Sequence, residues 1–134
     1  MNNFKISNTS ANAEADALAA LLNNGYLRIY DGAQPANANS GITTQNKLAE
    51  LRFGATAFGA AAAGVIAANP IASDTDAAAT GTASWFRCLK SDGTTVVCDG
   101  SVGTSGADLN LNSVGIQQHA QVQVSSLTIT VVES

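Results

Sequence analysis

Hydrophobic and polar residues alternate with a period of two along most of the chain, which is the spacing of half-buried strands. In YLRIY, for example, Leu27 and Ile29 fall on one face and the aromatic and basic residues on the other. About seven runs are predicted to be strands: 26–30, 47–53, 64–69, 83–90, 94–102, 108–112 and 120–133. Strands at such short spacing, without alternating helices, predict a mainly β fold: an antiparallel β-sandwich or barrel.

One segment near the N-terminus has helical spacing instead. We expect a short helix from Ser10 to Gly25, in which Ser10 or Asn12 caps the first turn and the acidic residues that follow suit its dipole. Gly25 can adopt the left-handed conformation that ends a helix. The expected apolar stripe consists of Leu18, Leu21 and Leu22.

Residues 1–9, which precede this helix, are polar and have no period. They are predicted to be a flexible N-terminal arm, and either a frayed end or a segment that reaches a neighbouring subunit fits them. Residues 10–134 are expected to form a single β-sandwich domain, because 134 residues leave no room for a second core.

The alanine-rich segment 54–73 is ambiguous. Alanine favours a helix, whereas Gly54, Gly59 and Gly64 each weaken one by about 1 kcal/mol. We favour a short strand at GVIAAN, bounded by Gly64 and Pro70.

The two cysteines lie in adjacent strand-like runs that are joined by Ser91-Asp92-Gly93, a hairpin turn sequence. A two-residue turn would pair Cys88 with Val97, and a three-residue turn would pair Cys88 with Cys98. We expect free or optionally paired thiols, with little dependence of stability on reductant.

Charge is sparse and scattered. The chain has 10 acidic and 6 basic residues, for a net charge of −4, and its basic residues form no cluster that would neutralise phosphates. We therefore expect no nucleic-acid partner, unless folding assembles a basic groove.

A signal sequence and a long apolar run are not apparent, so we expect a protein made in a cytoplasm, with no membrane partner.

The ionisable residues do not form a recognised catalytic or metal-binding motif. Cys88, Cys98 and His119 are three soft ligands without Cys-x-x-Cys spacing, and Asp74 with Asp76 is a bare Asp-x-Asp. The remaining acidic candidates are expected at turns or on solvated strands: Asp31, Glu50, Asp92 and Asp99. We assign no catalytic, cofactor-binding or metal-binding residue and predict that the chain is not an enzyme.

Aromatic residues could serve as sugar platforms or as core. For Trp85, Tyr26 and Tyr30 we favour core packing, because the chain has only seven aromatic residues.

Three segments, within about residues 17–132, resemble small proteins of tailed bacteriophages and prophages. They are NNGYLRIYDGAQPANAN, LAELRFGATAFGAAAAGVIAANPIASDTDAAATGTASWFRCLKSDGTTVVCDGSVGTSGADLNLNS and QVQVSSLTITV. Such proteins look like capsid cement or decoration proteins, and the resemblance implies a jelly-roll-like sandwich that binds the assembled major capsid protein lattice at the virion surface. It also implies a homo-oligomer, a dimer or trimer. The alternative is a tail or fibre module that binds a receptor or glycan.

These predictions assign the residues structural roles. The core candidates are Leu27, Ile29, Leu48, Leu51, Phe53, Phe86, Val96, Leu109, Leu111, Val122, Val124, Leu127 and Ile129. The interface candidates are the arm, extended to residues 1–12, and the loop from Gln34 to Thr44.

Overall fold

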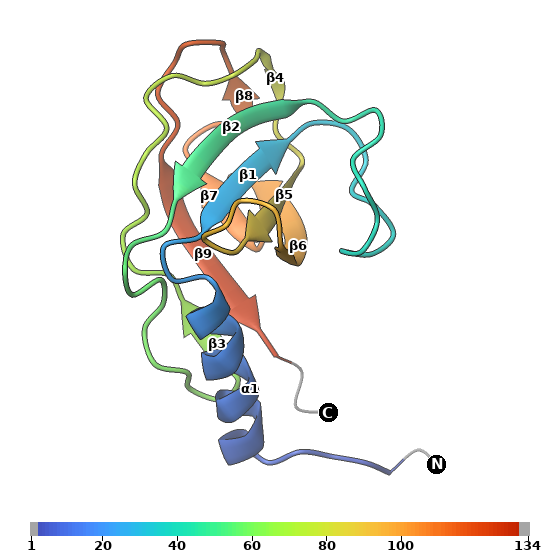
Figure 1. Cartoon of the computed structure of the whole chain (residues 1–134), viewed down its shortest axis with the longest axis vertical. Helices are drawn as coiled ribbons and strands as arrows, with labels where there is room; N and C mark the ends of the chain where they lie inside the picture. The colour runs from blue at the N-terminus through green and yellow to red at the C-terminus, as the bar shows by residue number, and fades with distance from the viewer. Residues whose placement is uncertain (1–2, 132–134) are drawn as a thin grey trace.

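The fold is built on one large, mixed β-sheet. A computed structural model describes residues 3–131. Seven strands form the sheet in the order β2-β1-β5-β6-β7-β9-β3, and β4 and β8 form a separate two-stranded ladder (Figure 1). The elements are α1 (Asn8–Leu21), β1 (Tyr26–Tyr30), β2 (Lys47–Arg52), β3 (Val65–Ala67), β4 (Gly81–Thr82), β5 (Trp85–Leu89), β6 (Val96–Gly103), β7 (Leu109–Leu111), β8 (Gly115–Ile116) and β9 (Val124–Thr130).

The predicted mainly β class with one N-terminal helix is confirmed, but the sheet arrangement differs in two ways. The strands form sheets of seven and two rather than two stacked sheets of similar size, so the jelly-roll sandwich is not confirmed. In addition, β6 and β7 pair in parallel, with Val102 opposite Leu109. Their tight connection is held by Asp108, whose Oδ2 accepts hydrogen bonds from the backbone N and Oγ of Ser101 at 3.0 and 3.1 Å.

Helix α1 begins earlier than predicted. Ser7 is the N-cap, because its hydroxyl accepts a hydrogen bond from the backbone N of Ser10 at 3.2 Å, so neither Ser10 nor Asn12 caps the helix. Residues 8 and 9 consequently belong to the helix and not to the arm. After its last turn, the left-handed residue is Asn24, with φ 58°, rather than Gly25. Gly25 is required for a different reason: a Cβ there would collide with the backbone oxygen of Leu89.

Small residues dominate the buried face of α1, which also corrects the predicted leucine stripe. Leu21 is exposed and Leu18 is only half-buried. The buried positions recur every three or four residues, as helix geometry requires. They are Ala11, Ala15, Ala19 and Leu22.

The alanine-rich segment is irregular, apart from the short strand β3, which confirms the strand expected there. Two polar side chains of α1 hold this segment in place: Asn12 Oδ1 accepts from Gly64 N, and Asp16 Oδ1 accepts from Ala61 N, both at 2.9 Å. Gly64 has φ +76°, and a Cβ there would lie 2.6 Å from the backbone oxygen of Val131, so both backbone conformation and space favour glycine at this position.

The core matches the predicted set closely. Ten of the thirteen candidates are buried, while Val96, Val124 and Ile129 are half-buried. The predicted C-terminal strand is shorter, because Val122 makes only an isolated bridge with Asp74 and β9 starts at Val124. Residues 132–134 lie outside the described range. Large side chains beyond the thirteen candidates are also buried: Leu22, Tyr30, Phe58, Ile66, Trp85, Leu89 and Ile116.

Candidate interaction surfaces

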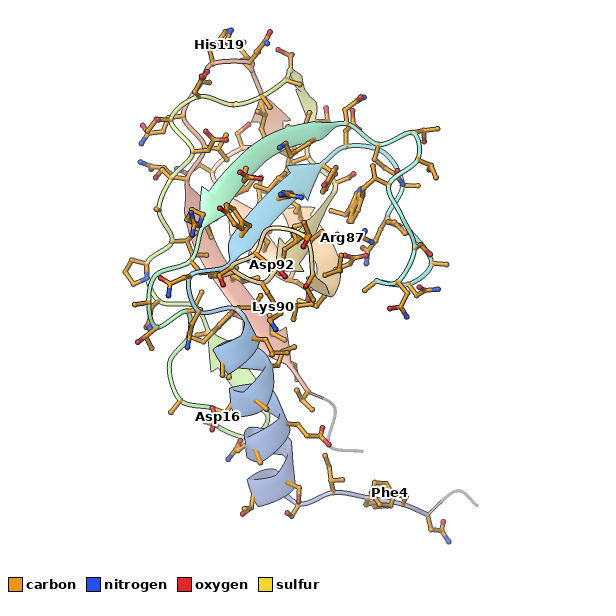
Figure 2. All side chains as sticks on the ribbon, viewed as in Figure 1. Phe4, Asp16, Arg87, Lys90, Asp92 and His119 are labelled. Carbon is orange, nitrogen blue, oxygen red and sulfur yellow. The ribbon has the colours of Figure 1, made fainter. Side chains whose placement is uncertain are left out.

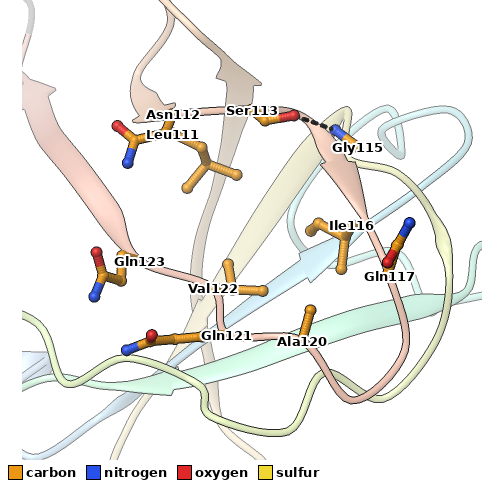
Figure 3. A pocket seen from close by; sticks show the side chains of 10 residues that line it. All are labelled: Leu111, Asn112, Ser113, Gly115, Ile116, Gln117, Ala120, Gln121, Val122 and Gln123. Atoms are coloured by element: carbon orange, nitrogen blue, oxygen red, sulfur yellow. Dashed lines mark hydrogen bonds between the residues drawn. The ribbon is translucent and has the colours of Figure 1, made fainter.

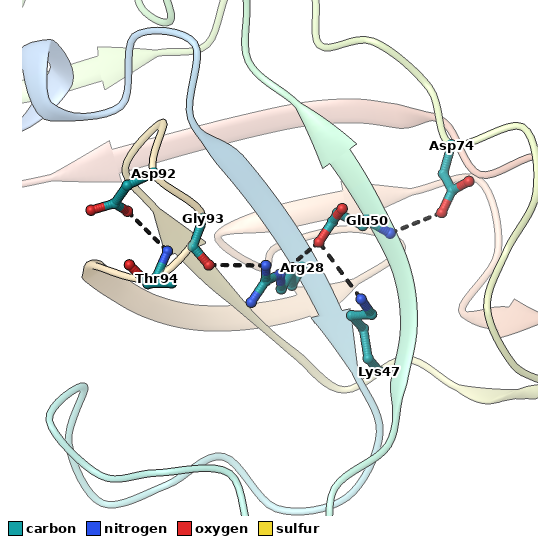
Figure 4. Close-up of polar contacts among 7 residues, drawn as sticks. All are labelled: Arg28, Lys47, Glu50, Asp74, Asp92, Gly93 and Thr94. Carbon is teal, nitrogen blue, oxygen red and sulfur yellow. Dashed lines mark hydrogen bonds and ion pairs between the residues drawn. The ribbon is translucent and has the colours of Figure 1, made fainter.

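A row of four charged residues crosses one face of the sheet. The register places Glu50, Arg28, Arg87 and Asp99 side by side on β2, β1, β5 and β6. Arg28 Nε binds Glu50 Oε2 at 2.7 Å and its Nη2 donates to the backbone oxygen of Gly93 at 3.0 Å (Figure 4). These contacts occupy the charges within the fold, so the row is not an open binding site.

Arg87 and Asp99 form the buried end of this row. Their side chains are only 5% and 3% exposed, and they share two hydrogen bonds of 2.7 and 2.8 Å. The carboxylate raises the pKa of the Arg87 guanidinium. The prediction that Asp99 lies at a turn or on a solvated strand is therefore wrong. Asp99 lies within the predicted strand 94–102, but its ion pair with Arg87 is visible only after strand pairing is known.

The aromatic candidates on this face are used internally. The rings of Tyr30 and Trp85 stack with centroids 4.7 Å apart, and Trp85 Nε1 donates to the backbone oxygen of Asp31 at 3.0 Å. Both side chains are buried. Tyr26 is half-buried under the guanidinium of Arg52, whose carbon lies 4.1 Å from the ring centroid. Core packing, favoured from the sequence, is confirmed for Trp85 and Tyr30, and neither ring is available as a sugar platform.

The cysteines face each other across the β5–β6 hairpin. Cys88 is directly opposite Cys98, and both are free thiols. Of the two registers considered, the structure has the one that pairs the cysteines, but the turn is longer than expected: Lys90 N donates to Thr95 O at 2.9 Å, and the register shifts between Cys88 and Leu89. Burial raises the pKa of the Cys88 thiol, whereas a hydrogen bond from Cys88 lowers the pKa of Cys98.

Acidic residues at turns serve the backbone. Asp92 Oδ2 accepts a hydrogen bond from the Thr95 hydroxyl, and its Oδ1 accepts from the backbone N of Thr95 and of Thr94, both at 2.9 Å. The hydroxyl bond and the two amide bonds, in that order, hold the pKa of Asp92 well below its usual range. Asp31 accepts from Asn46, which lowers its pKa as well. The turn roles expected for both are confirmed.

His119 and the Asp-x-Asp pair do not converge on a metal. His119 lies at an exposed turn, with Nδ1 2.6 Å from Asp76 Oδ1. Asp74 instead accepts from Glu50 N at 2.8 Å and Asp76 N at 2.9 Å. Across residues 3–131, no group of three His, Cys, Asp or Glu side chains is placed to hold a metal ion.

The loop between β1 and β2 projects from the body of the molecule (Figures 1 and 2). Residues 32–46 contain no ionisable side chain, and most of them are exposed. Local hydrogen bonds still give the loop a defined shape: Gln45 Nε2 donates to Ala33 O at 2.6 Å, and Asn39 N donates to Asn37 Oδ1 at 2.9 Å. Ile42, within this loop, is 40% exposed. This loop includes the interface candidate Gln34–Thr44, and it is an ordered, neutral surface.

A pocket of about 200 Å³ lies at the β7–β8 end of the molecule (Figure 3). Leu111, Ile116 and Val122 provide its apolar part. Its polar lining is made of carboxamides and a hydroxyl, which both donate and accept hydrogen bonds. These residues are Asn112, Ser113, Gln117, Gln121 and Gln123. With no ionisable group in its lining, the pocket suits neutral polar groups such as a peptide backbone.

The arm, the other interface candidate, extends away from the N-terminal end of α1 (Figure 2). Residues 3–7 have no helical or strand structure, and residues 1 and 2 lie outside the described range. Phe4 is 74% exposed, the most of any large apolar side chain in residues 3–131.

Comparison with known proteins found no match. The chain matches no family model, no curated protein and no solved structure. Within residues 3–131, no helix is both long and apolar enough to span a membrane.

Proposed function

We propose that the chain is a structural virion protein of a tailed phage, made in the host cytoplasm, which binds the assembled major capsid protein lattice and stabilises the head. The observation that carries the proposal is the projecting loop 32–46, an ordered surface of 15 residues without any ionisable group. Such a surface can be buried against another protein without desolvating a charge. The sequence resemblance to decoration proteins supports the same function.

The stabilising mechanism is mass action. A protein that binds the assembled lattice, but not the free subunits, stabilises the lattice by RT ln(1 + [L]/Kd), about 2.7 kcal/mol per site when its free concentration is 100 times Kd. Because the proposed contact surface is neutral, its binding should change little with salt.

The alternative is a tail or fibre module that binds a receptor or glycan, and we considered exposed aromatic rings as the sugar platform of its glycan-binding form. That form depended on exposed Trp85 or Tyr30, and both rings are buried in the stack. A tail location is tested by the labelling in electron micrographs described next.

The test uses particles of the phage or prophage that encodes the chain, with its gene disrupted. Heads without the protein should release DNA at a lower temperature than normal heads, and added purified protein should restore stability and label the head in electron micrographs. A variant in which residues 32–45 are replaced by Asn-Gly should fold but fail to bind, because Asp31 N still bonds Asn46 O to close the hairpin.

The control is His119→Asn, which changes an exposed side chain on another loop. Asparagine tolerates the positive φ of 71° at this position, so the variant should bind like the native protein. Unaltered head stability without the protein, or label confined to the tail, would refute the proposed function.

A further inference from the structure

A shallow groove lies between helix α1 and the segment 56–60. Its volume is about 260 Å³, several times the roughly 30 Å³ that a water molecule occupies, so it can hold a side chain. Its apolar lining comes from Ala19, Ala20, Phe58 and Ala60, and Asp16 also lines it. The groove has a defined shape because Asp16 Oδ1 and Asn23 Oδ1 each accept a backbone hydrogen bond at 2.9 Å, from Ala61 and Ala57 respectively.

The arm has the matching properties. Phe4 and Ile6 alternate with Lys5 and Ser7, and the aromatic ring of Phe4 is 74% exposed. Lys5 is the one charged residue of segment 3–7, whereas α1 carries two acidic residues and no basic one. The arm and the helix are thus complementary both in apolar surface and in charge.

The arm cannot reach the groove of its own chain. From Ser7 to Ala19 the helix rises by about 18 Å, at roughly 1.5 Å per residue. The three residue steps from Ser7 back to Phe4 span at most about 11 Å, even when fully extended. Figure 2 also shows Phe4 and Asp16 on opposite sides of the helix. Any arm in the groove must therefore come from another molecule.

We propose that residues 3–7 of one copy of this chain dock in the α1 groove of a second copy, with Phe4 in the apolar part and Lys5 near Asp16. The two contact surfaces differ, so the contact occurs once per subunit, either reciprocally in a dimer or around a closed ring. The inference concerns the free chain and does not depend on capsid binding.

Sedimentation equilibrium of the purified chain tests the contact. The native protein should self-associate, and Phe4→Ala should weaken association by about 10- to 100-fold, the loss expected for one large apolar side chain. The fold should be unchanged, because Phe4 is exposed. The matched control is Ile42→Ala, which truncates another exposed apolar side chain on the distant loop. A native chain that stays monomeric, or association that survives Phe4→Ala, overturns the proposal.

Cross-linking locates the contact. In a Cys88→Ala/Cys98→Ala background, an Asn3→Cys chain, which keeps Phe4, is mixed under oxidising conditions with a tagged Ala20→Cys chain, both positions being exposed. A disulfide-linked hetero-pair is expected. The control mixture replaces Ala20→Cys by Ile42→Cys, and equal cross-linking in the two mixtures contradicts docking in the groove.

Discussion

The guanidinium of Arg87 is buried because Asp99 offers it two hydrogen bonds and because Trp85 lies beside it, 5.4 Å from the guanidinium carbon to the ring centroid. A buried ion pair adds little net stability compared with apolar residues of the same shape, but removing one partner leaves a desolvated charge. The partly exposed pair of Arg28 and Glu50 on the same row is solvated and avoids this penalty.

Asp99→Ala should therefore lower the free energy of unfolding by about 3–5 kcal/mol, because Arg87 stays buried without a counter-ion. Urea unfolding followed by tryptophan fluorescence measures this directly at the neighbouring Trp85. The matched control is Glu50→Ala, whose ion pair is 25–33% exposed and should cost about 1 kcal/mol or less. Similar losses in both variants would contradict the role given to burial.

The two thiols also differ by position. Cys88 is fully buried and burial raises its pKa, while Cys98 is half-buried and the hydrogen bond from Cys88 favours its thiolate. Only the thiolate is nucleophilic, so the two residues should differ in rate of alkylation.

Iodoacetamide should modify Cys98 first in the native protein. Because its pKa is lowered, its rate should rise with pH and level off below the pH at which an ordinary cysteine, with a pKa of about 8.5, does so. Mass spectrometry over a pH series gives the rate at each thiol. In the Cys98→Ser control, Cys88 should react only after urea unfolds the chain. Equal native rates at the two thiols would disprove this assignment.

Among the elements, helix α1 shows most clearly how one side chain places a boundary. The Ser7 hydroxyl satisfies the Ser10 amide, one of the four amides that a helix leaves unpaired at its start. Both serines are exposed, and a sequence pattern alone does not distinguish them.

Ser7→Ala should lower the free energy of unfolding by about 1 kcal/mol, the usual cost of a lost N-cap. Ser10→Ala is the matched control and should change it by less than about 0.5 kcal/mol, since the Ser10 side chain is exposed and does not cap the helix. Denaturant unfolding of the two variants decides between the caps. A larger loss in Ser10→Ala would support the boundary predicted from sequence.

Across the whole molecule, charge and neutral surface are segregated. The charged row lies within the sheet, where strand register pairs its residues, while the projecting loop carries no ionisable group. The loop and the α1 groove lie on different parts of the molecule (Figure 1). The proposed lattice contact through the loop and the proposed contact between copies through the arm would therefore use separate surfaces and would not compete.

Local sequence determined the positions of the seven strands of the large sheet, the presence of the helix and most of the core, but not the short ladder of β4 and β8. Alternation in YLRIY and LNL reports which side chains are buried, because neighbouring residues of a strand point to opposite faces. Asp92 before Gly93 marked the hairpin turn for a local reason as well, since its carboxylate binds amides two and three residues ahead.

Tertiary structure alone decided the features that depend on residues distant in sequence. The parallel pairing of β6 with β7, the opposition of Cys88 and Cys98, and the partner of Asp99 all require the strand register. Tyr30, which stacks on Trp85 and helps to bury it, lies 55 positions earlier in the sequence. The two rings meet only because β1 and β5 are adjacent. Periodicity describes one segment's own geometry, whereas these contacts arise between segments, and the free energy of packing the whole chain selects them.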